Sequence, residues 1–496
     1  MDNKSPLHLV CLPEDILLAI SVYLHVTDVL SLKQTCRVLH AFGGSDYLWH
    51  LIMPLFDLPF DIGPDVLLTA LSGKELQDLA FKAIKLEQNW TKPEPQIKKI
   101  TSVIHSTDDM YVDTMTLLPG AKWLVTGQRG KTGSCITLWS LHDLEDVRSV
   151  ATLLFPRSLD SYGTGMHQDG SATLTVSMMI NDQKMLKVYA LPLQEYIQNK
   201  HILPATPRPI ATYSRPMTQG IIHALSIYNS VVVATLVHWS QTGPLSPSFS
   251  LLFLNSVTGV TRVVDHPLPE NTNDVGVYIC PRHVAITSVI NQESAFVHVY
   301  QLPPSILQPG RALDSAMYGS EPTSTEQTDH LGPLVTQYRF SLPVSHHYHI
   351  SGGLHHPWKF YLTSFAYPGS EGSIRSYICL YNIRLSLPHS DGISYPAAPI
   401  DTIPTVLPVN DGTSAPVVCV GITGRRAVWL ERHWEREEVR LMRLSHTAAG
   451  SMAVVLVPPH PVLPFTPATC HSLAFDEVTG RLCVGLETGE LYVLDY

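Results

Sequence analysis

Charged residues are scarce in this chain, at 15% of 496 residues, against about a quarter in an ordinary soluble domain. The net charge is −10, and lysine and arginine form no run longer than pairs such as Lys98-Lys99 and Arg425-Arg426. Nucleic acid and anionic membrane surfaces are therefore not expected partners, because binding to either depends on a basic patch.

The eight cysteines are scattered, without a CxxC pair or a regular spacing, which argues against a disulfide framework. We expect free, mostly buried thiols in a reducing compartment, and hence a cytoplasmic or nuclear location. Long apolar runs that would predict a membrane span are missing. The apolar stretch after Leu7 is interrupted by Glu14 and Asp15, unlike that of a secretory signal.

Motifs of common catalytic classes are missing too, among them a GxSxG elbow, a P-loop, HExxH and a RING-like Cys/His array. The densest histidine cluster, from His346 to His356, is interrupted by Gly352-Gly353 and has no cysteine close by. We expect a polar strand end there rather than a metal site. The sequence predicts no cofactor and no catalytic residue.

What the chain does have, in its first fifty residues, is a series of short helices with more apolar surface than they can bury among themselves. Leu-Pro at 12–13 is followed by Glu14 and Asp15, which place negative charge at the positive end of a helix dipole. Apolar residues then recur at helical spacing over 16–24 and 29–49. The pattern indicates a segment that docks on a second polypeptide.

The order of these residues resembles an F-box of the fungal type. The shared features are the Leu-Pro opening, the acidic pair, Ile-Leu-Leu, Asp-Val-Leu-x-Leu, Cys-Arg-x-Leu and a late Trp, over residues 12–49. The resemblance implies binding to the Skp-type adaptor of a cullin–RING ubiquitin ligase. By position, the contact residues would be Leu12, Pro13, Ile16, Leu17, Ile20, Val29, Leu32, Cys36 and Leu39. On this basis we expect Leu17→Asp to abolish adaptor binding while the rest of the chain stays folded.

A second helical segment follows. Ser72 and Glu75 have the spacing of a capping box, and an apolar stripe runs from Leu76 to Leu86. Two prolines within 93–95 cannot continue a helix, so the helical part ends there. This segment resembles the connecting helix of fungal F-box proteins.

Beyond residue 95 the chain changes to short runs of β-branched and aromatic residues separated by turn residues. Related strand-like endings recur at 135–141, 186–191, 250–254, 296–300, 378–383, 439–444 and 491–496. Such a repeat predicts a β-propeller, here with seven blades. The endings resemble WD-repeat strands, although the Gly-His and Trp-Asp signatures are missing. A pair of β-sandwiches would also give short strands at even intervals and stays open as an alternative.

The sequence thus predicts an α+β multidomain protein, with a small all-α F-box-like bundle at 1–56, connecting helices at 57–95 and an all-β propeller at 96–496. Four arginines near expected turns could bind an acidic or phosphorylated client segment: Arg129, Arg375, Arg425 and Arg426. The alternative is that they are ordinary surface arginines.

The function that the resemblance implies is a non-catalytic one. The chain would be the substrate-recognition subunit of a Skp–cullin–F-box ubiquitin ligase, with the propeller holding a client protein. Two alternatives stay open: a propeller enzyme with the helices as an accessory, and a scaffold whose helices assemble with machinery unrelated to ubiquitin.

Overall fold

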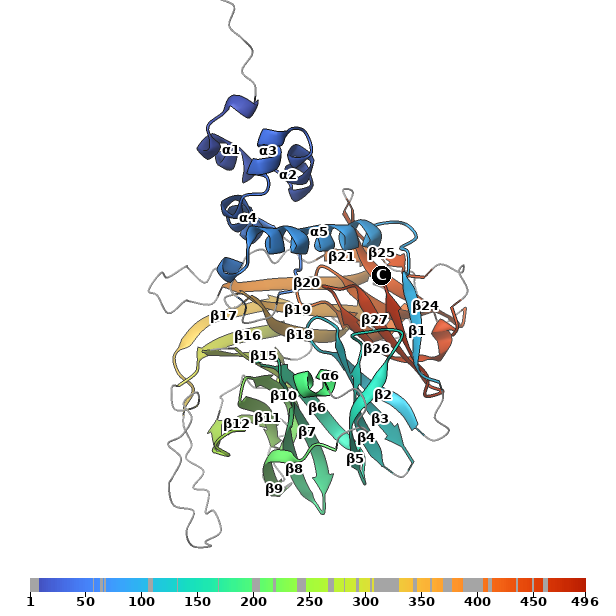
Figure 1. The fold of residues 1–496 in the computed structure, drawn as a ribbon. Helices are drawn as coiled ribbons and strands as arrows, with labels where there is room; N and C mark the ends of the chain where they lie inside the picture. Colours follow the sequence, from blue (N-terminus) through green and yellow to red (C-terminus); the bar gives the residue numbers. More distant parts are fainter. Residues whose placement is uncertain are drawn as a thin grey trace, which may run out of the picture.

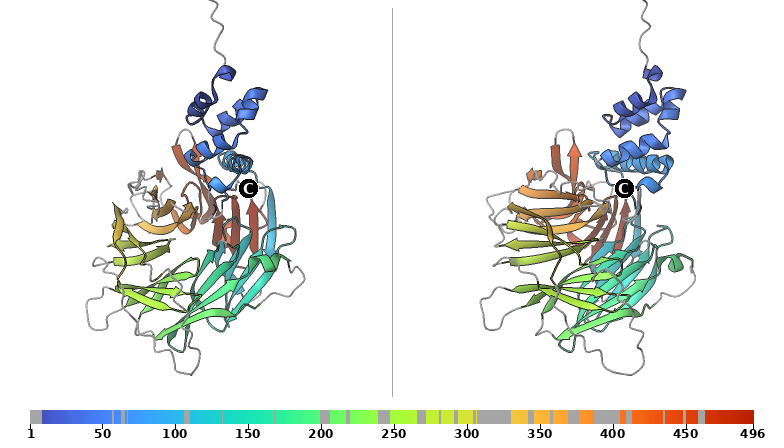
Figure 2. Two further views of the ribbon diagram at one scale, coloured as in Figure 1. Left: turned by 60° about the vertical axis from the view of Figure 1, so that its left-hand side comes forward. Right: turned by 90° about the vertical axis from the view of Figure 1, so that its left-hand side faces the viewer.

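The computed structural model describes residues 9–56, 58–62, 66, 68–105, 110–131, 133–167, 169–198, 206–216, 220–238, 247–265, 272–280, 282–290, 294–303, 306, 330–341, 346–356, 359–368, 377–386, 405–408, 413–433, 436–447, 450–457 and 463–496. A small helical head stands on one side of a large body of β-sheets, and a longer helix lies between them (Figures 1 and 2). Arg375 and residues 304–329, except Ile306, lie outside the described residues.

The head consists of α1 (Glu14–Ser21), α2 (Val26–Lys33), α3 (Arg37–Phe42) and α4 (Asp46–Ile52), with 3-10 turns at Leu9–Cys11, Met53–Leu55 and Leu68–Ala70. Pro13 precedes α1, where its missing N–H costs no helical hydrogen bond. The Ser45 hydroxyl accepts a hydrogen bond from the backbone N–H of Leu48 and so caps α4. Leu48 and Trp49 of α4 are fully buried and form the centre of the head.

The connecting helix, α5, spans Gly73–Trp90. The predicted capping box is present, with the Ser72 hydroxyl on the N–H of Glu75 and the Glu75 carboxylate on the N–H of Ser72. The helix ends at Trp90, before the two prolines, as the sequence predicts. The α5 N-terminus is fixed to the head, because the N–H of Gly73 donates to Asp46 Oδ1 at 2.8 Å.

The described strands form seven antiparallel sheets of four strands each, which is a seven-bladed propeller and not a pair of sandwiches. Blade 1 contains β2 (Met110–Leu117), β3 (Trp123–Gly130), β4 (Ser134–Ser140) and β5 (Arg148–Phe155). Blade 2 contains β6 (Leu159–Met166), β7 (Ala172–Ile180), β8 (Gln183–Leu191) and β9 (Pro209–Pro216). Blade 3 contains β10 (Ile221–Tyr228), β11 (Val231–His238), β12 (Ser248–Asn255) and β13 (Thr261–Asp265). Blade 4 contains β14 (Thr272–Ile279), β15 (His283–Ile290), β16 (Ser294–Gln301) and β17 (Leu334–Ser341). Blade 5 contains β18 (His346–His356), β19 (Lys359–Pro368), β20 (Tyr377–Ser386) and β21 (Thr405–Pro408). Blade 6 contains β22 (Thr413–Val420), β23 (Ala427–His433), β24 (Glu438–Thr447) and β25 (Gly450–Val455). Blade 7 contains β26 (Cys470–Asp476), β27 (Arg481–Leu486), β28 (Leu491–Asp495) and β1 (Lys99–Ile104), and a short helix α6 (Leu193–Gln198) follows β8.

The seven strand-like endings of the sequence are the third strands of the seven blades, not the last. In blade 1, for example, the third strand β4 is buried along nearly its whole length, whereas the outer strand β5 is partly exposed. A strand buried on both faces is a continuous apolar run and is easily found in a sequence. The outer strands carry a weaker pattern, so the sequence does not mark them as the ends of the blades.

The ring is closed by a strand from the start of the β-region. β1 pairs antiparallel with β28, from Lys99 opposite Asp495 to Ile104 opposite Leu491. The N–H of Lys98 adds a hydrogen bond to the Asp495 carbonyl at 2.7 Å. The last blade is therefore completed by the residues that directly follow α5, which couples the helical segment to the closure of the propeller.

The cysteines are free; Cys11 and Cys36 are exposed, and the other six are buried or half-buried. Burial raises the pKa of the Cys483 thiol. Among the described residues no cluster of three metal-ligating side chains occurs, and no described helix has the length and hydropathy to cross a bilayer. His346–His356 forms β18, but its side chains lie outside the described part.

Candidate docking face and its link to the propeller

One face of the head is apolar and open to solvent. Ile16 and Ile20 of α1, one helical turn apart, keep 44% and 36% of their surface exposed, and Tyr23 beyond them keeps 88%. Leu9, Val10 and Val38 are exposed as well. Single exposed apolar residues are ordinary, but a group of them on one small domain marks an interaction surface.

The nine predicted contact residues divide into two groups. Pro13, Ile16, Ile20 and Cys36 are exposed and Leu12 and Leu32 half-buried, so these six can reach a partner. The other three are corrected by the structure, because they fill the core of the head itself: Leu17, Val29 and Leu39, at 5%, 2% and 4% exposure. Helical spacing places residues on a stripe but does not say which edge of the stripe faces the protein's own core.

The expectation for Leu17→Asp changes accordingly. A carboxylate at this buried position would lie unpaired in an apolar core, which destabilises the head itself. Loss of binding by that variant would not distinguish a lost contact from unfolding. Ile16 and Ile20 are the positions at which the docking face can be changed without opening the core.

The core of the head is completed by α5 and not by propeller strands. Its described members all lie between Leu12 and Ile84, and Leu76, Ala80, Ala83 and Ile84 of α5 belong to it. Lys33 Nζ of α2 also donates to Gln77 Oε1 of α5 at 2.7 Å. The exposed face on α1 is therefore free of the described strands.

The same helix belongs to a second core. Leu86 and Trp90, in the last turns of α5, are buried among residues of blades 6 and 7. Gly480 in the first turn of blade 7 has φ +74, and a Cβ there would lie 2.5 Å from Leu86 Cδ1. One continuous helix thus packs in the head as far as Ile84 and in the propeller with its last turn and a half, from Leu86 to Trp90 (Figure 1).

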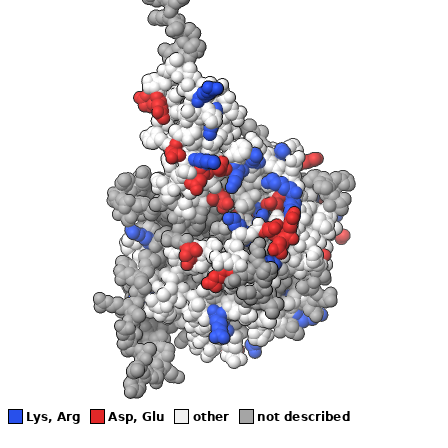
Figure 3. Space-filling model, in the orientation of Figure 1, with Lys and Arg blue, Asp and Glu red and all other residues white. Residues whose placement is uncertain are grey.

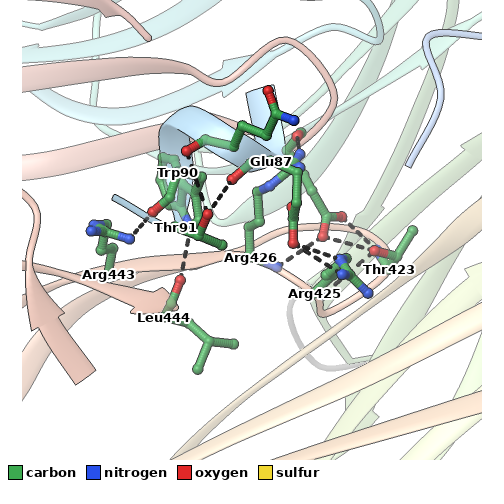
Figure 4. A network of polar contacts seen from close by, with 10 residues as sticks. Glu87, Trp90, Thr91, Thr423, Arg425, Arg426, Arg443 and Leu444 are labelled. Atoms are coloured by element: carbon green, nitrogen blue, oxygen red, sulfur yellow. Dashed lines mark hydrogen bonds and ion pairs between the residues drawn. The ribbon is translucent and has the colours of Figure 1, made fainter. Parts of the chain in front are cut away.

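An ion-pair network fixes α5 to blade 6 (Figure 4). Glu87 accepts from Arg425 Nη2 at 2.9 Å and from Arg426 Nη2 at 2.5 Å. The Arg426 side chain is 1% exposed and that of Arg425 28%. The structure corrects the predicted client-binding role of Arg426, because solvent does not reach its side chain. Arg425 is also paired with Glu87 of α5.

A buried carboxylate of blade 7 shapes the turn that carries these arginines. Glu477 accepts from the N–H and hydroxyl of Thr423 at 2.8 and 2.7 Å, and from the N–H of Arg426 at 2.9 Å. Arg426 Nη1 in turn donates to the Glu477 carbonyl at 2.6 Å. Burial raises the pKa of Glu477, against the opposing effect of these donors. The turn between β22 and β23 is thereby held in place to meet Glu87.

Trp90 and Arg443 fix the C-terminal end of α5. Trp90 is 1% exposed, and its Nε1 donates a hydrogen bond to the Leu444 carbonyl at 2.7 Å. Its ring stacks on that of Phe475, with 5.2 Å between the ring centroids. The guanidinium of Arg443 donates to the carbonyls of Trp90 and Lys92. The Trp90 carbonyl has no partner within the helix, and a cation at this end also matches the helix dipole. Burial lowers the pKa of Arg443 to about 10, so the side chain stays charged at pH 7.

Charged groups of both signs are intermixed where α5 meets the propeller (Figure 3). Arg129, a third predicted client contact, lies elsewhere, at the end of β3, where its Nη2 is 3.0 Å from Asp113 Oδ2. Its side chain is 43% exposed, and exposed pairs of this kind contribute little to stability. Arg129 remains a candidate for client binding; the fourth arginine, Arg375, lies outside the described residues.

The pKa of Glu87 provides a test of this network. Burial raises that pKa, but the charges of Arg426 and Arg425 outweigh it and hold the pKa below its usual value. The pairing therefore stabilises the fold fully above the unfolded-state pKa of about 4.3, and the stabilisation is lost as the pH falls through the lower folded-state value. We expect the difference in urea midpoint between wild type and Glu87→Gln to shrink below about pH 4. A difference that stays constant into strong acid would contradict this assignment.

The sequence analysis named Arg425 and Arg426 but missed their pairing with Glu87, because Glu87 and Arg426 are 339 positions apart. Their own surroundings in the sequence carry no sign of the pairing. The one local signal for a second packing partner of α5 is the large aromatic Trp90 at the very end of the helix, and the sequence analysis did not use it.

Comparison with known proteins supports the assignment of the head. Residues 9–53 match the F-box-like family, and no curated protein matches the chain. An F-box-like domain joined to a propeller is an architecture typical of non-catalytic adaptor proteins. The chain contains an F-box-like domain at residues 9–53 followed by a seven-bladed β-propeller.

Proposed function

We propose that this chain is the substrate-recognition subunit of a Skp–cullin–F-box ubiquitin ligase, acting in the cytoplasm or nucleus. Its F-box-like head binds a Skp-type adaptor, and its propeller holds a client protein. The observation that supports the proposal is the exposed apolar face around Ile16 and Ile20, on a domain whose family binds such adaptors.

In this role the chain would contribute proximity rather than chemistry. Holding a client beside a loaded ubiquitin-conjugating enzyme raises its effective concentration, which speeds transfer without any catalytic side chain on the adaptor. A fixed geometry is needed for this effect. The shared helix α5, packed in both cores, supplies a joint of that kind.

The proposal predicts that Ile16→Asp/Ile20→Asp weakens adaptor binding at least about tenfold. The exposed parts of both side chains would be buried on docking, at about 25 cal/mol per Å², and the new carboxylates would be desolvated without partners. Affinity of the purified full chain for a Skp-type adaptor, measured by titration calorimetry, gives the result. Leu154→Asp on β5, where the leucine is 80% exposed, is the matched control and should bind normally.

Unchanged affinity of the double variant would refute the docking face. If the wild type itself binds no Skp-type adaptor but co-purifies with other proteins through the same face, the scaffold alternative replaces the ligase. For client identification, proteins retained by the double variant in an affinity purification, and stabilised in cells that express it, are the candidates.

A further inference from the structure

The interface between blades 2 and 3 changes from apolar to charged at one of its ends. Leu186 and Tyr213 of blade 2 pack there against Leu236 and Leu252 of blade 3. Side chains two positions apart on a strand point to the same face. The next residues on that face are therefore Lys184 and Arg215 from blade 2, and His238 and Ser250 from blade 3.

The four residues Lys184, Arg215, His238 and Ser250 form a polar layer between the two blades. Two of them are buried cations that lie side by side. Lys184 of β8 lies directly opposite Arg215 of β9, and the two residues are 4% and 6% exposed. Directly opposite residues have their Cβ atoms about 4.5–5.5 Å apart, and like charges at that spacing repel. This arrangement is unfavourable unless negative charge is supplied nearby.

A carboxylate among the described residues supplies negative charge to one of the two cations. Lys184 Nζ lies 2.7 Å from Asp160 Oδ2. For Arg215, by contrast, Nε and Nη1 are buried and have no hydrogen-bond partner in the described chain. A buried guanidinium without partners is among the most costly arrangements in a protein interior.

The blade 3 side does not neutralise Arg215. His238 Nε2 and Ser250 Oγ are 2.8 Å apart. Burial lowers the pKa of His238 and nearby Arg215 lowers it further, against the opposing charge of Asp265, so the ring is neutral at pH 7. Asp265 lies opposite Ser250 in the sheet, but it is exposed. The layer thus has an unpaired cation and a hydroxyl.

The layer lies at the rim of the propeller, away from the helices. α5 contacts turns between the first and second strands of blades, such as that of Arg425 and Arg426. Lys184 follows the turn between the second and third strands of blade 2, at Asn181-Asp182, and antiparallel strands place these two kinds of turn at opposite ends. Figure 1 shows β8 and β9 at the end of the body remote from the head.

We propose that Lys184, Arg215 and Ser250 form an oxyanion-binding site that takes a carboxylate or phosphoryl group between blades 2 and 3. Charge-assisted hydrogen bonds from Arg215 and Lys184 would hold the anion, and the Ser250 hydroxyl can donate a further one. The site is independent of the head and of its partner, and it offers the α5-distal end of the propeller a means of recognising an acidic or phosphorylated group.

The test uses the full-length chain and its melting temperature at fixed ionic strength. Sodium chloride is replaced stepwise by sodium phosphate in one arm and by sodium acetate in the other. A ligand that binds the folded state raises the melting temperature with concentration. We expect the wild type to respond to at least one anion, and the arm with the larger response identifies the favoured oxyanion.

The variant Arg215→Met shows whether Arg215 binds the anion or only stabilises the fold. In chloride the variant should melt at or above the wild-type temperature, because it lacks the unpaired buried charge, and its apparent anion affinity should fall roughly tenfold or more. Arg129→Met, which removes an exposed arginine that has its own partner, should respond like the wild type.

The proposal is overturned if neither anion stabilises the wild type, or if Arg215→Met keeps the full anion response. Should Arg215→Met not fold, Lys184→Met and Arg215→Lys take its place. Each must weaken the response to the anion, and an unchanged response in either would equally overturn the site.

Discussion

Trp90→Ala should lower the free energy of unfolding by about 3–5 kcal/mol, the usual cost of removing a large aromatic side chain from a core. Trp90 is 1% exposed, stacks on Phe475, and lies edge-on to Tyr496 at 5.8 Å. Arg443 lies over its ring with Cζ 5.7 Å from the centroid. The substitution would leave a cavity where α5, blade 6 and blade 7 meet.

Urea unfolding followed by far-ultraviolet circular dichroism measures the loss, and native-state hydrogen exchange locates it. Because β1 begins nine residues after Trp90 and closes the ring on β28, we expect amides of both strands to exchange faster in the variant. Trp90→Phe is the control: it keeps most of the ring packing and loses the hydrogen bond to Leu444, at a cost of about 1 kcal/mol. Faster exchange confined to the head would contradict the assignment of Trp90 to the propeller core.

Glu87→Leu should destabilise the chain by about 3–5 kcal/mol, because it removes one partner of a buried ion pair and leaves the other unpaired. Arg426 would keep its bond to the Glu477 carbonyl, but its buried charge would lose the carboxylate. The 18% exposure of the Glu87 side chain admits some water, which favours the lower part of that range.

A double-mutant cycle with Arg426→Met isolates the pair. If Glu87 acts on Arg426, the double variant should be more stable than the sum of the two single changes, since the cation that Glu87 neutralises is then removed together with it. Additive losses would show that Glu87 contributes through packing or through Arg425. In the proposed ligase, Glu87→Leu should also lower ubiquitin transfer to a bound client more than it lowers adaptor affinity, because the joint between head and propeller loosens.

Local features of the chain could be predicted because they depend on near neighbours. The capping box of Ser72 and Glu75 and the helix end at Trp90 follow from spacing and from the prolines after it. The seven blades were found from their third strands, which are buried on both faces. For the proposed docking face, helical periodicity found the apolar stripe of α1 but could not separate the exposed Ile16 from its buried neighbour Leu17.

The sequence by itself determined the helical head, the helix after it, and the number of blades, since each is encoded by patterns a few residues long. Only the tertiary structure decided which side chains of the head face solvent, that Arg425 and Arg426 bind α5, and that β1 completes the last blade. Arg215 likewise reads as an ordinary strand residue until blade 3 is packed over it. The physical reason is that burial and charge pairing join residues hundreds of positions apart, and no local pattern records which of them meet.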